Sequence, residues 1–200
     1  MKEYFADIMS TLQNSLSSLD EEQFTKLVND CTEAIGEGGK VIVSGLGKNV
    51  PVCDKFVGTM VSLGQNACFM NTNSAAHGDL GMVMPGDVVI ILTKSGETAE
   101  SVYLAKHLLE RDCKLWLLTF REQSTMRQML PNSLVLKLEN EGDPWDIVPN
   151  NSTTVNLIVL QGLALHIAKN RGVTLDDFKK NHPGGFIGEQ LTRVSYIRSR

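Results

Sequence analysis

The sequence has few of the features that mark a disulfide-bonded or metal-binding protein. It carries four cysteines among 200 residues, Cys31, Cys53, Cys68 and Cys113, with no CxxC pair and no histidine at the spacing of a zinc site. Isolated cysteines of this kind argue against a disulfide framework and against a metal knuckle. We therefore expect reduced, mostly buried thiols and no bound metal.

The sequence also lacks an excess of positive charge and any long apolar run. Its formal net charge is −4, so it has no general attraction for nucleic acid or for an anionic membrane. The N-terminal "MKEYFADIMS" has acidic residues where a signal peptide has an apolar core, and no apolar run approaches the length of a membrane span. We expect a cytoplasmic protein that binds neither nucleic acid nor membrane.

The residues that are present describe a globular chain. Hydrophobic residues make up 42% and charged residues 21%, and this length suits one domain with a sizeable core. Short apolar runs predict five strands, at "KVIVSG", "ACFM", "DVVIILT", "KLWLLTF" and "SLVLKLE". The strongly apolar "DVVIILT" is typical of a strand covered on both faces.

Longer amphipathic segments alternate with these runs. They predict one or two helices over 2–35, broken at "SSLDEE", and helices over about 50–63, at "TAESVYLAKHLLERD" and at "STTVNLIVLQGLALHIAKNRG". The last has a hydroxyl cap at its start and Gly172 just past its end. Residues 74–80 are expected to form a loop, and "TLDDFKKN" is helix-like. The alternation predicts an α/β fold with a doubly wound, mostly parallel sheet and helices on both faces.

Two loops that follow predicted strands are suited to an anion. Ligands of open parallel sheets bind beyond the carboxyl ends of the strands. After the first strand come Ser44, Gly45 and Gly47, whose backbone amides can approach a ligand, and then Lys48. The spacing matches neither a P-loop nor a full dinucleotide fingerprint. Nucleotide binding is disfavoured, and a plain strand-to-helix turn is the alternative.

The second such loop is "TKSGET". It places Thr93, Ser95, Gly96 and Thr98 at the start of a predicted helix, where free amides and the positive end of the helix dipole favour phosphate. A capping motif would explain Ser95 or Thr98 but not the whole set. The two loops together predict a phosphate site.

Five motifs in this order, over nearly the whole chain, resemble one family. "SGLGK", "AAHGDLGM", "TKSGETAES", "NSTT" and "HPGGFIG" are similar to the sugar isomerase (SIS) domain, and specifically to its arabinose-5-phosphate isomerase (KpsF/GutQ-like) branch. The resemblance implies a three-layer αβα sandwich around a five-stranded parallel sheet, of the flavodoxin-like or Rossmann-like kind. It also implies a bound sugar phosphate and a homo-oligomer, dimer or tetramer, with active sites shared between subunits.

The resemblance extends to domain organisation. We expect residues 1–200 to form a single SIS domain that includes an N-terminal helical segment, 1–36, and a C-terminal HPGG tail, 181–200. Members of this branch often carry a pair of C-terminal CBS modules. The sequence ends at "TRVSYIRSR", so the expectation is an SIS domain without them, and without regulation through them.

The resemblance also assigns the chemistry. It implies an aldose–ketose isomerase that acts through an enediol, for which carboxylates and imidazoles suffice without a cofactor. The family's catalytic lysine, two glutamates and histidine fall on Lys48, Glu100, Glu141 and His182, and its second histidine falls on His77. The tail with His182 is expected to cross to a neighbouring subunit and complete its site.

Alternatives remain at several of these positions. Glu100 lies in the first turn of a predicted helix, where the dipole favours any carboxylate, and Glu139 and Asp143 are rivals of Glu141. We expect Glu141 rather than Glu100 to be the proton-transfer base.

The sequence departs from the branch at three places. Asn49 stands in place of the usual Ser or Thr, "PNNSTT" replaces a run like "PTSST", and Lys94 stands where many members have an uncharged residue. These departures leave the particular sugar open. The alternative functions are a non-catalytic sugar-phosphate-binding regulatory SIS domain and a 6-phospho-3-hexuloisomerase.

Overall fold

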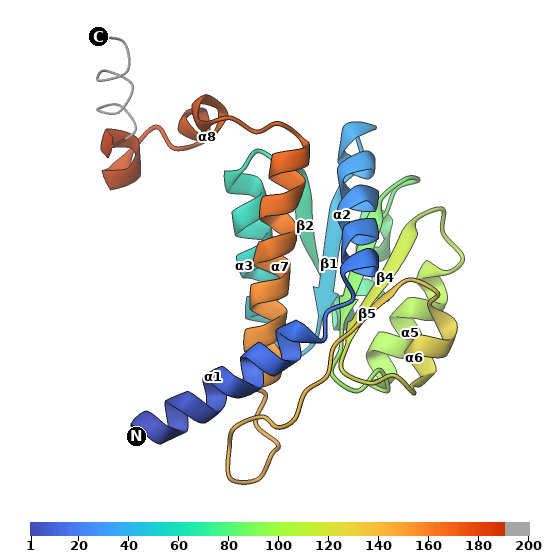
Figure 1. Cartoon of the computed structure of the whole chain (residues 1–200). Coiled ribbons are helices and arrows are strands. Elements are labelled where there is room, and N and C mark those ends of the chain that lie inside the picture. Colours follow the sequence, from blue (N-terminus) through green and yellow to red (C-terminus); the bar gives the residue numbers. More distant parts are fainter. Residues whose placement is uncertain (191–200) are drawn as a thin grey trace.

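The computed structural model describes residues 1–190 and is built on a five-stranded sheet in which every neighbouring pair of strands is parallel (Figure 1). The strands are β1 (Val41–Gly45), β2 (Ala67–Asn71), β3 (Val88–Leu92), β4 (Lys114–Thr119) and β5 (Ser133–Val135). Their order across the sheet is β2-β1-β3-β4-β5. The predicted α/β class and five-stranded parallel sheet are confirmed.

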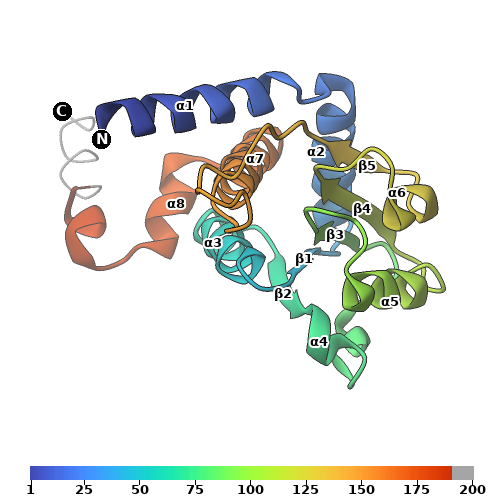
Figure 2. The ribbon, with the colours of Figure 1, turned by 90° about the horizontal axis from the view of Figure 1, so that it is seen from below.

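Helices cover both faces of the sheet (Figure 2). They are α1 (Lys2–Ser17), α2 (Glu21–Gly36), α3 (Asn49–Ser62), α4 (Thr72–Ala75), α5 (Ala99–Leu108), α6 (Thr125–Met129), α7 (Asn151–Asn170) and α8 (Leu175–Asn181). Successive strand residues point to opposite faces. Val41 and Val43 therefore pack with α2, α3 and α7, whereas Ile42 packs with α5 and α6.

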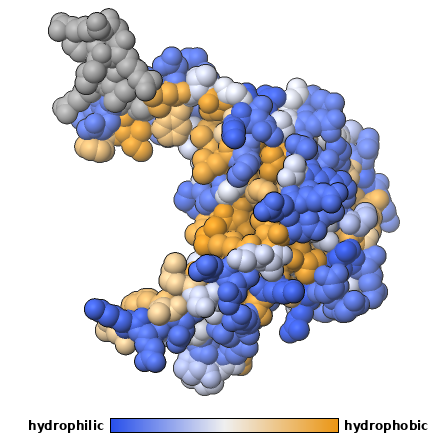
Figure 3. Space-filling model, in the orientation of Figure 1, coloured by the Kyte–Doolittle hydropathy of each residue, from blue (hydrophilic) through white to orange (hydrophobic). Residues whose placement is uncertain are grey.

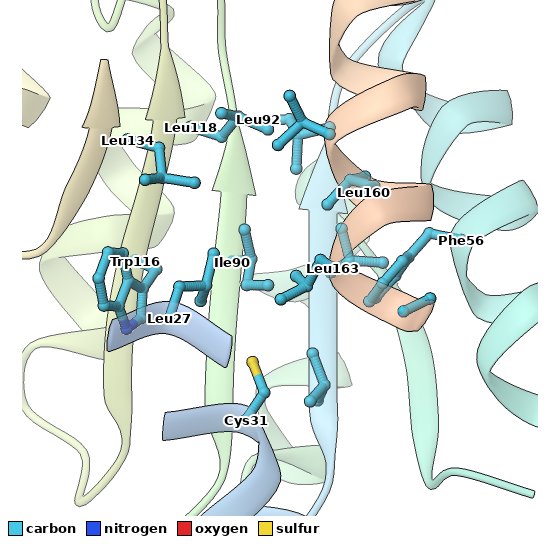
Figure 4. Close-up of a cluster of buried hydrophobic side chains, with 14 of the residues drawn as sticks. Leu27, Cys31, Phe56, Ile90, Leu92, Trp116, Leu118, Leu134, Leu160 and Leu163 are labelled. Carbon is cyan, nitrogen blue, oxygen red and sulfur yellow. The ribbon is translucent and has the colours of Figure 1, made fainter. Parts of the chain in front are cut away.

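The larger of the two cores lies under α2, α3 and α7. Figure 4 shows Leu27 of α2 beside Trp116 and Ile90 of the sheet, with Leu163 of α7 and then Phe56 of α3 further along the same face. Each of these five side chains is at most 2% exposed. Burial on this scale stabilises each large side chain by about 1.5–3 kcal/mol relative to exposure. The core thus holds α2, α3 and α7 against one face of the sheet.

Most predicted elements are present, with three differences. The first segment breaks at "SSLDEE" as expected, where Asp20 caps α2 by accepting hydrogen bonds from the Glu22 and Gln23 amides. The expected loop over 74–80 instead contains the end of α4 and the start of a 3₁₀ turn, Asp79–Met82. The short helix α6 was not predicted, because five residues carry too little periodicity to detect.

The third difference is the length of β5. The sequence predicts a strand over "SLVLKLE", but β5 ends at Val135. Its first residue pairs with Leu117, so only three residues of β4 remain beside it before β4 ends at Thr119. An edge strand has one neighbour, and its ladder stops where that neighbour stops.

The four thiols are all free. Cys31 and Cys53 are buried, while Cys68 and Cys113 are half-buried. Burial raises the pKa of the Cys53 thiol to about 12, which keeps it protonated at neutral pH. This is the environment of an inert, structural cysteine.

Two helices extend from the body on the same side. Helix α1 and the α8 segment stand at opposite ends of α7, with a hollow between them (Figures 1 and 3). Apolar side chains that are half or more exposed on this part of the molecule include Phe5 and Met9 of α1 and Leu165 of α7. Among the helices of residues 1–190, none combines the length and apolar character needed to cross a membrane.

Candidate functional site

The candidate site lies at the carboxyl edge of the sheet, where the strand order reverses. β1 is followed by α3 on one face, and its neighbour β3 is followed by α5 on the other. The two connections leave in opposite directions, and such a reversal point is where open parallel sheets usually bind ligands, in a crevice between the loops. Both loops that the sequence assigns to an anion begin here.

The loop after β1 is shaped by two glycines. A side chain at Gly45 would bring its Cβ to 2.8 Å from the Cβ of Asn49, and Gly47 has a φ of 57°. Larger residues at either position are therefore disfavoured. Lys48 is exposed at the start of α3, and Asn49 Oδ1 accepts a hydrogen bond from Asn156 Nδ2 of α7 at 3.0 Å. That bond places the starts of α3 and α7 side by side.

Ser44 has a partner inside the protein. Its side chain is fully buried, and its Oγ lies 2.9 Å from Thr72 Oγ1 at the start of α4. This hydrogen bond joins β1 to the segment that follows β2. The role of Ser44 as a phosphate ligand remains a prediction.

The loop after β3 is held by its own hydroxyl groups. The Gly96 amide donates to Thr93 Oγ1 at 3.2 Å, and the Glu97 amide donates to Ser95 Oγ at 3.2 Å. Thr98 is the N-cap residue of α5, and in the described part of the chain its side chain accepts no hydrogen bond from the amides of the first turn. The amides of the first turn of α5 are thus left for a ligand or for water.

Helix α6 clamps the same loop from behind. Glu97 Oε1 accepts a hydrogen bond from the Thr125 amide at 2.7 Å, and the Met126 amide donates to the Gly96 carbonyl at 3.2 Å. The hydrogen bonds from Thr125 lower the pKa of the Glu97 carboxyl. Gly96 has a φ of 68°, and a Cβ there would lie 2.7 Å from Ser124 Cβ. The loop conformation therefore depends on glycine at this position.

Glu141 is a fully buried carboxylate at the start of α7. Its Oε2 accepts hydrogen bonds from the Asn150 amide at 3.1 Å and the Ser152 amide at 2.9 Å. The sequence predicts a hydroxyl cap for this helix, and that prediction is wrong. The hydroxyls of Thr153 and Thr154 instead donate back to the Asn150 carbonyl, and the capping group is the carboxylate of Glu141.

The second oxygen of Glu141 pairs with Lys94. Lys94 Nζ lies 2.7 Å from Glu141 Oε1, and the lysine side chain is 41% exposed. Burial by itself would raise the pKa of the Glu141 carboxyl, but the bonds from Lys94, Ser152 and Asn150 outweigh burial and lower it. Glu141 is therefore ionised at neutral pH, with both oxygens engaged. Sequence comparison with the family identifies Lys94 as an unusual residue at its position, but it does not predict the contact between Lys94 and Glu141.

Glu100 has a different environment. It is exposed in the first turn of α5 and lines an open hollow of about 390 Å³ with Thr72, Asn73 and Tyr103. Ala76 lines the same hollow, and the exposed His77 follows it. A carboxylate that faces open space can accept a proton from a bound molecule, whereas Glu141 has both oxygens occupied. Glu100 is thus the more accessible of the two carboxylates, and the assignment of the base to Glu141 remains a prediction.

His182 lies away from the other predicted residues. Asn181 Nδ2 donates to the Ser62 carbonyl at the end of α3, where the chain leads into the start of β2. This is the amino edge of the sheet. The His182 ring stacks on Phe178, with ring centroids 4.0 Å apart, and Nδ1 lies 2.8 Å from the Phe178 carbonyl. The last part of the predicted tail, 191–200, lies outside the described residues.

The structure thus gathers most of the predicted site residues at one edge. The loops with Gly45, Gly47 and Lys48, with Thr93 to Glu100, and with Glu141 all follow carboxyl ends of strands, and His182 does not. Over residues 1–190, no three His, Cys, Asp or Glu side chains are grouped so that they could hold a metal ion. The arrangement at the carboxyl edge suits a phosphate with an attached polar group.

Comparison with known proteins places this architecture. A family model described as "SIS domain" matches residues 35–170. Arabinose 5-phosphate isomerase KdsD of Salmonella typhi is 35% identical over 192 residues, which cover 96% of this chain and 58% of that protein. The chain thus spans less than two thirds of the length of the curated relatives that it matches.

Solved structures agree with this match. An Escherichia coli CFT073 protein in complex with arabinose 5-phosphate superposes with a TM-score of 0.83 and 29% identity, covering 91% of this chain and 95% of that one. The Vibrio vulnificus NanR protein, complexed with ManNAc-6P, gives a TM-score of 0.72 and 17% identity, covering 90% of this chain and 65% of that one. The second likeness concerns the fold alone.

Proposed function

This chain belongs to the SIS domain family, and from that premise we propose that it is an aldose–ketose isomerase of sugar phosphates, of the arabinose 5-phosphate/ribulose 5-phosphate type. The observation that carries the proposal is the point between β1 and β3 where the strand order reverses, with an exposed lysine and an exposed carboxylate beside two loops that suit an anion. Its likeness to the Escherichia coli protein that holds arabinose 5-phosphate supports the choice of sugar.

The reaction moves one proton between neighbouring carbons. A base removes the proton from C2 of the open-chain aldose phosphate while the C1 oxygen gains a proton, which gives an enediol. The proton then returns to C1, and the C2 hydroxyl loses its proton to give the ketose. Each transfer needs a positioned acid or base near the operating pH. No electron acceptor or donor is consumed.

Different groups of the crevice supply the parts of this chemistry. The phosphate binds to the amides of the two loops, with Ser95 and Thr98 beside the uncapped start of α5. Glu100 is the base that acts at carbon, and Lys48 and His77 face the oxygens of the sugar. Glu141 contributes through the position of α7. The charge of the phosphate is favoured by the positive end of α5.

His182 is proposed to act in the site of a neighbouring copy. It lies at the amino edge of its own subunit, so it completes a site only if a second chain brings its own α8 to this crevice. The apolar surface between α1 and α8 (Figure 3) supports such an assembly, because exposed apolar patches of this kind mark protein contacts. We propose a homo-oligomer with shared active sites, dimer or tetramer, in the cytoplasm, where its four free thiols remain reduced.

A substrate panel tests the proposal. The purified chain is incubated with pentose and hexose phosphates, and isomer formation is followed by NMR. Conversion of arabinose 5-phosphate with incorporation of solvent deuterium at carbon is the expected result. Binding without conversion of any sugar phosphate would instead support the regulatory alternative, and conversion restricted to a hexulose 6-phosphate would support the hexuloisomerase.

A further inference from the structure

The Lys94–Glu141 ion pair joins two parts of the candidate site that are far apart in the sequence. Lys94 belongs to the loop after β3, which carries the phosphate-binding residues, and Glu141 holds the first turn of α7. We propose that Lys94 is a positioning residue that fixes the Glu141 carboxylate and thereby ties the phosphate-binding loop to the start of α7. Only the catalytic consequence of this proposal depends on the proposed isomerase function.

The backbone of Lys94 is itself held in place. Its carbonyl accepts hydrogen bonds from the Phe120 amide at 3.2 Å and from Thr119 Oγ1 at 3.1 Å, both at the end of β4. The side chain therefore starts from a fixed point and reaches Glu141 across the carboxyl edge. An anchored ammonium group constrains its partner more than a lysine on a mobile loop would.

Both carboxylate oxygens of Glu141 have partners inside the protein. One oxygen receives Lys94 Nζ at 2.7 Å, and the other receives two amides of α7. The Glu141 carbonyl also accepts a hydrogen bond from Asn150 Nδ2 at 3.0 Å. A carboxylate used in this way orients a helix, and its function depends on remaining ionised.

Several acidic residues lie in the segments around Glu141. Asp146 Oδ1 accepts a hydrogen bond from the Glu141 amide at 2.6 Å, and Asp143 lies in the same loop. On the side of α1, Asp7 and Glu139 line a hollow with Gly142. These neighbours carry negative charge, which disfavours an ionised carboxylate. Lys94 supplies the positive charge that is ion-paired with Glu141. Without Lys94, the α7 amides would stabilise the ionised carboxylate against these negative charges by themselves.

The first experiment reads the pair directly, without substrate. In ¹⁵N-labelled protein, the amide shift of Ser152, which donates to Glu141, is followed from pH 7 downward in the wild type, K94Q and K94R. An opposite charge at contact lowers a carboxyl pKa by about 1–3 units. The midpoint should therefore rise by at least about one pH unit in K94Q and change by less than half a unit in K94R. Equal midpoints in the wild type and K94Q would overturn the proposal.

A matched control exists in K114Q. Lys114, the first residue of β4, has a similarly exposed side chain, 44%, and also forms ion pairs, with Asp30 and Glu33 of α2. That is the opposite edge of the sheet. K114Q should leave the Ser152 titration unchanged, and a shift as large as that of K94Q would show that overall charge, rather than the pair, moves it.

The second experiment reads the catalytic consequence. In K94Q, the acid limb of kcat/KM for the sugar phosphate should move upward with the Ser152 midpoint, while KM at pH 8 changes less than about threefold, and K94R should restore the limb. An acid limb that stays in place while the Ser152 midpoint moves would overturn the catalytic role. If the wild type converts no sugar phosphate, the proposed isomerase function fails, and the Ser152 titration still decides whether Lys94 positions Glu141.

Discussion

The two glutamates of the candidate site differ in the freedom of their carboxylates. Glu100 is exposed beside the open hollow next to α4, whereas Glu141 is fully buried with both oxygens bonded. A general base needs access to the proton that it removes. At the scale of the residue, the difference in exposure is the basis for proposing different roles for the two glutamates.

We predict that Glu100→Gln and Glu141→Gln have different effects. Glu100→Gln removes the proton acceptor while keeping size, so kcat should fall by about 100-fold or more with phosphosugar affinity nearly unchanged. Glu141→Gln weakens a helix cap and removes the charge that Lys94 pairs with, so it should lower the free energy of unfolding by about 1–2 kcal/mol and reduce kcat/KM less than Glu100→Gln does. Thermal unfolding and solvent deuterium exchange into the substrate measure the two effects.

Two exposed glutamates serve as controls for this comparison. Glu110→Gln, just past the far end of α5, should change neither turnover nor stability, and Glu139→Gln should not reproduce the destabilisation of Glu141→Gln. Loss of deuterium exchange in Glu141→Gln, with full exchange in Glu100→Gln, would reverse the assignment.

The part of Glu141 illustrates what sequence alone can supply at this scale. Its place after the last strand, and the family resemblance, predict a residue at the carboxyl edge. Its contacts with Asn150 and Ser152, nine and eleven positions later, follow from how the 142–149 loop folds back. Local capping rules look for Ser, Thr, Asp or Asn next to the helix, so they favoured the hydroxyls of the "STT" run instead.

At the scale of the element, the loop after β3 depends on α6. The clamp consists of two hydrogen bonds and the close approach of Gly96 to Ser124. The sequence predicts this loop as a phosphate site, but it does not predict α6, whose five residues show no clear period. The loop after β3 is therefore held in place by α6, a helix too short to be predicted from the sequence.

Gly96→Ala should disrupt this clamp. The substitution places a side chain at a φ of 68° and within 2.7 Å of Ser124 Cβ, so it adds a steric clash to backbone strain. Gly86→Ala is the matched control, because Gly86 has a φ of 84° with open space around it. In chemical denaturation, the free energy of unfolding should fall by about 1 kcal/mol for Gly86→Ala and by at least twice as much for Gly96→Ala. Equal losses would contradict the clash.

Helix α8 carries a pH-sensitive cap. Thr174 and Asp177 form a capping box, and hydrogen bonds from the Thr174 side chain and amide, with a bond from Lys180, lower the pKa of Asp177 to about 2. Because the folded pKa lies below the unfolded value of about 3.9, the cap stabilises α8 above about pH 4. That stabilisation is lost as pH falls through about 2.

The order of α8 should therefore decline over this window. Amide hydrogen exchange of residues 175–181 should accelerate, relative to the intrinsic rate, between about pH 4 and 2 in the wild type. Asp177→Asn should remove this dependence, and Asp176→Asn should retain it. Identical profiles for the wild type and Asp177→Asn would show that the capping box does not hold α8.

At the scale of the whole molecule, His182 and Lys48 lie at opposite edges of one sheet. If each site takes His182 from a neighbour, two inactive variants can complement each other. Lys48→Ala and His182→Ala, mixed and reassociated at random as dimers, should recover about a quarter of wild-type activity, because half of the dimers then hold one intact site of two.

The control mixes Lys48→Ala with Glu100→Gln. Lys48 and Glu100 both lie at the carboxyl edge of the same subunit's sheet, so every site in this mixture lacks one of the two side chains. This mixture should therefore recover no activity. Failure of the first mixture to recover activity, with each variant folded and associated, would place His182 outside the neighbouring site.

Helix α7 connects these two edges. It is 20 residues long, which corresponds to a rod of about 30 Å. Glu141 holds one end, and the other end leads through Gly172 to α8. In the proposed assembly the two ends of α7 contribute to different active sites, so the length of α7 sets the distance between those sites. Four inserted residues would lengthen it by about 6 Å and rotate the α8 segment by about 40°, moving His182 while the crevice stayed intact. Activity then depends on the length of this helix, because that length positions His182, as well as on the side chains in the crevice.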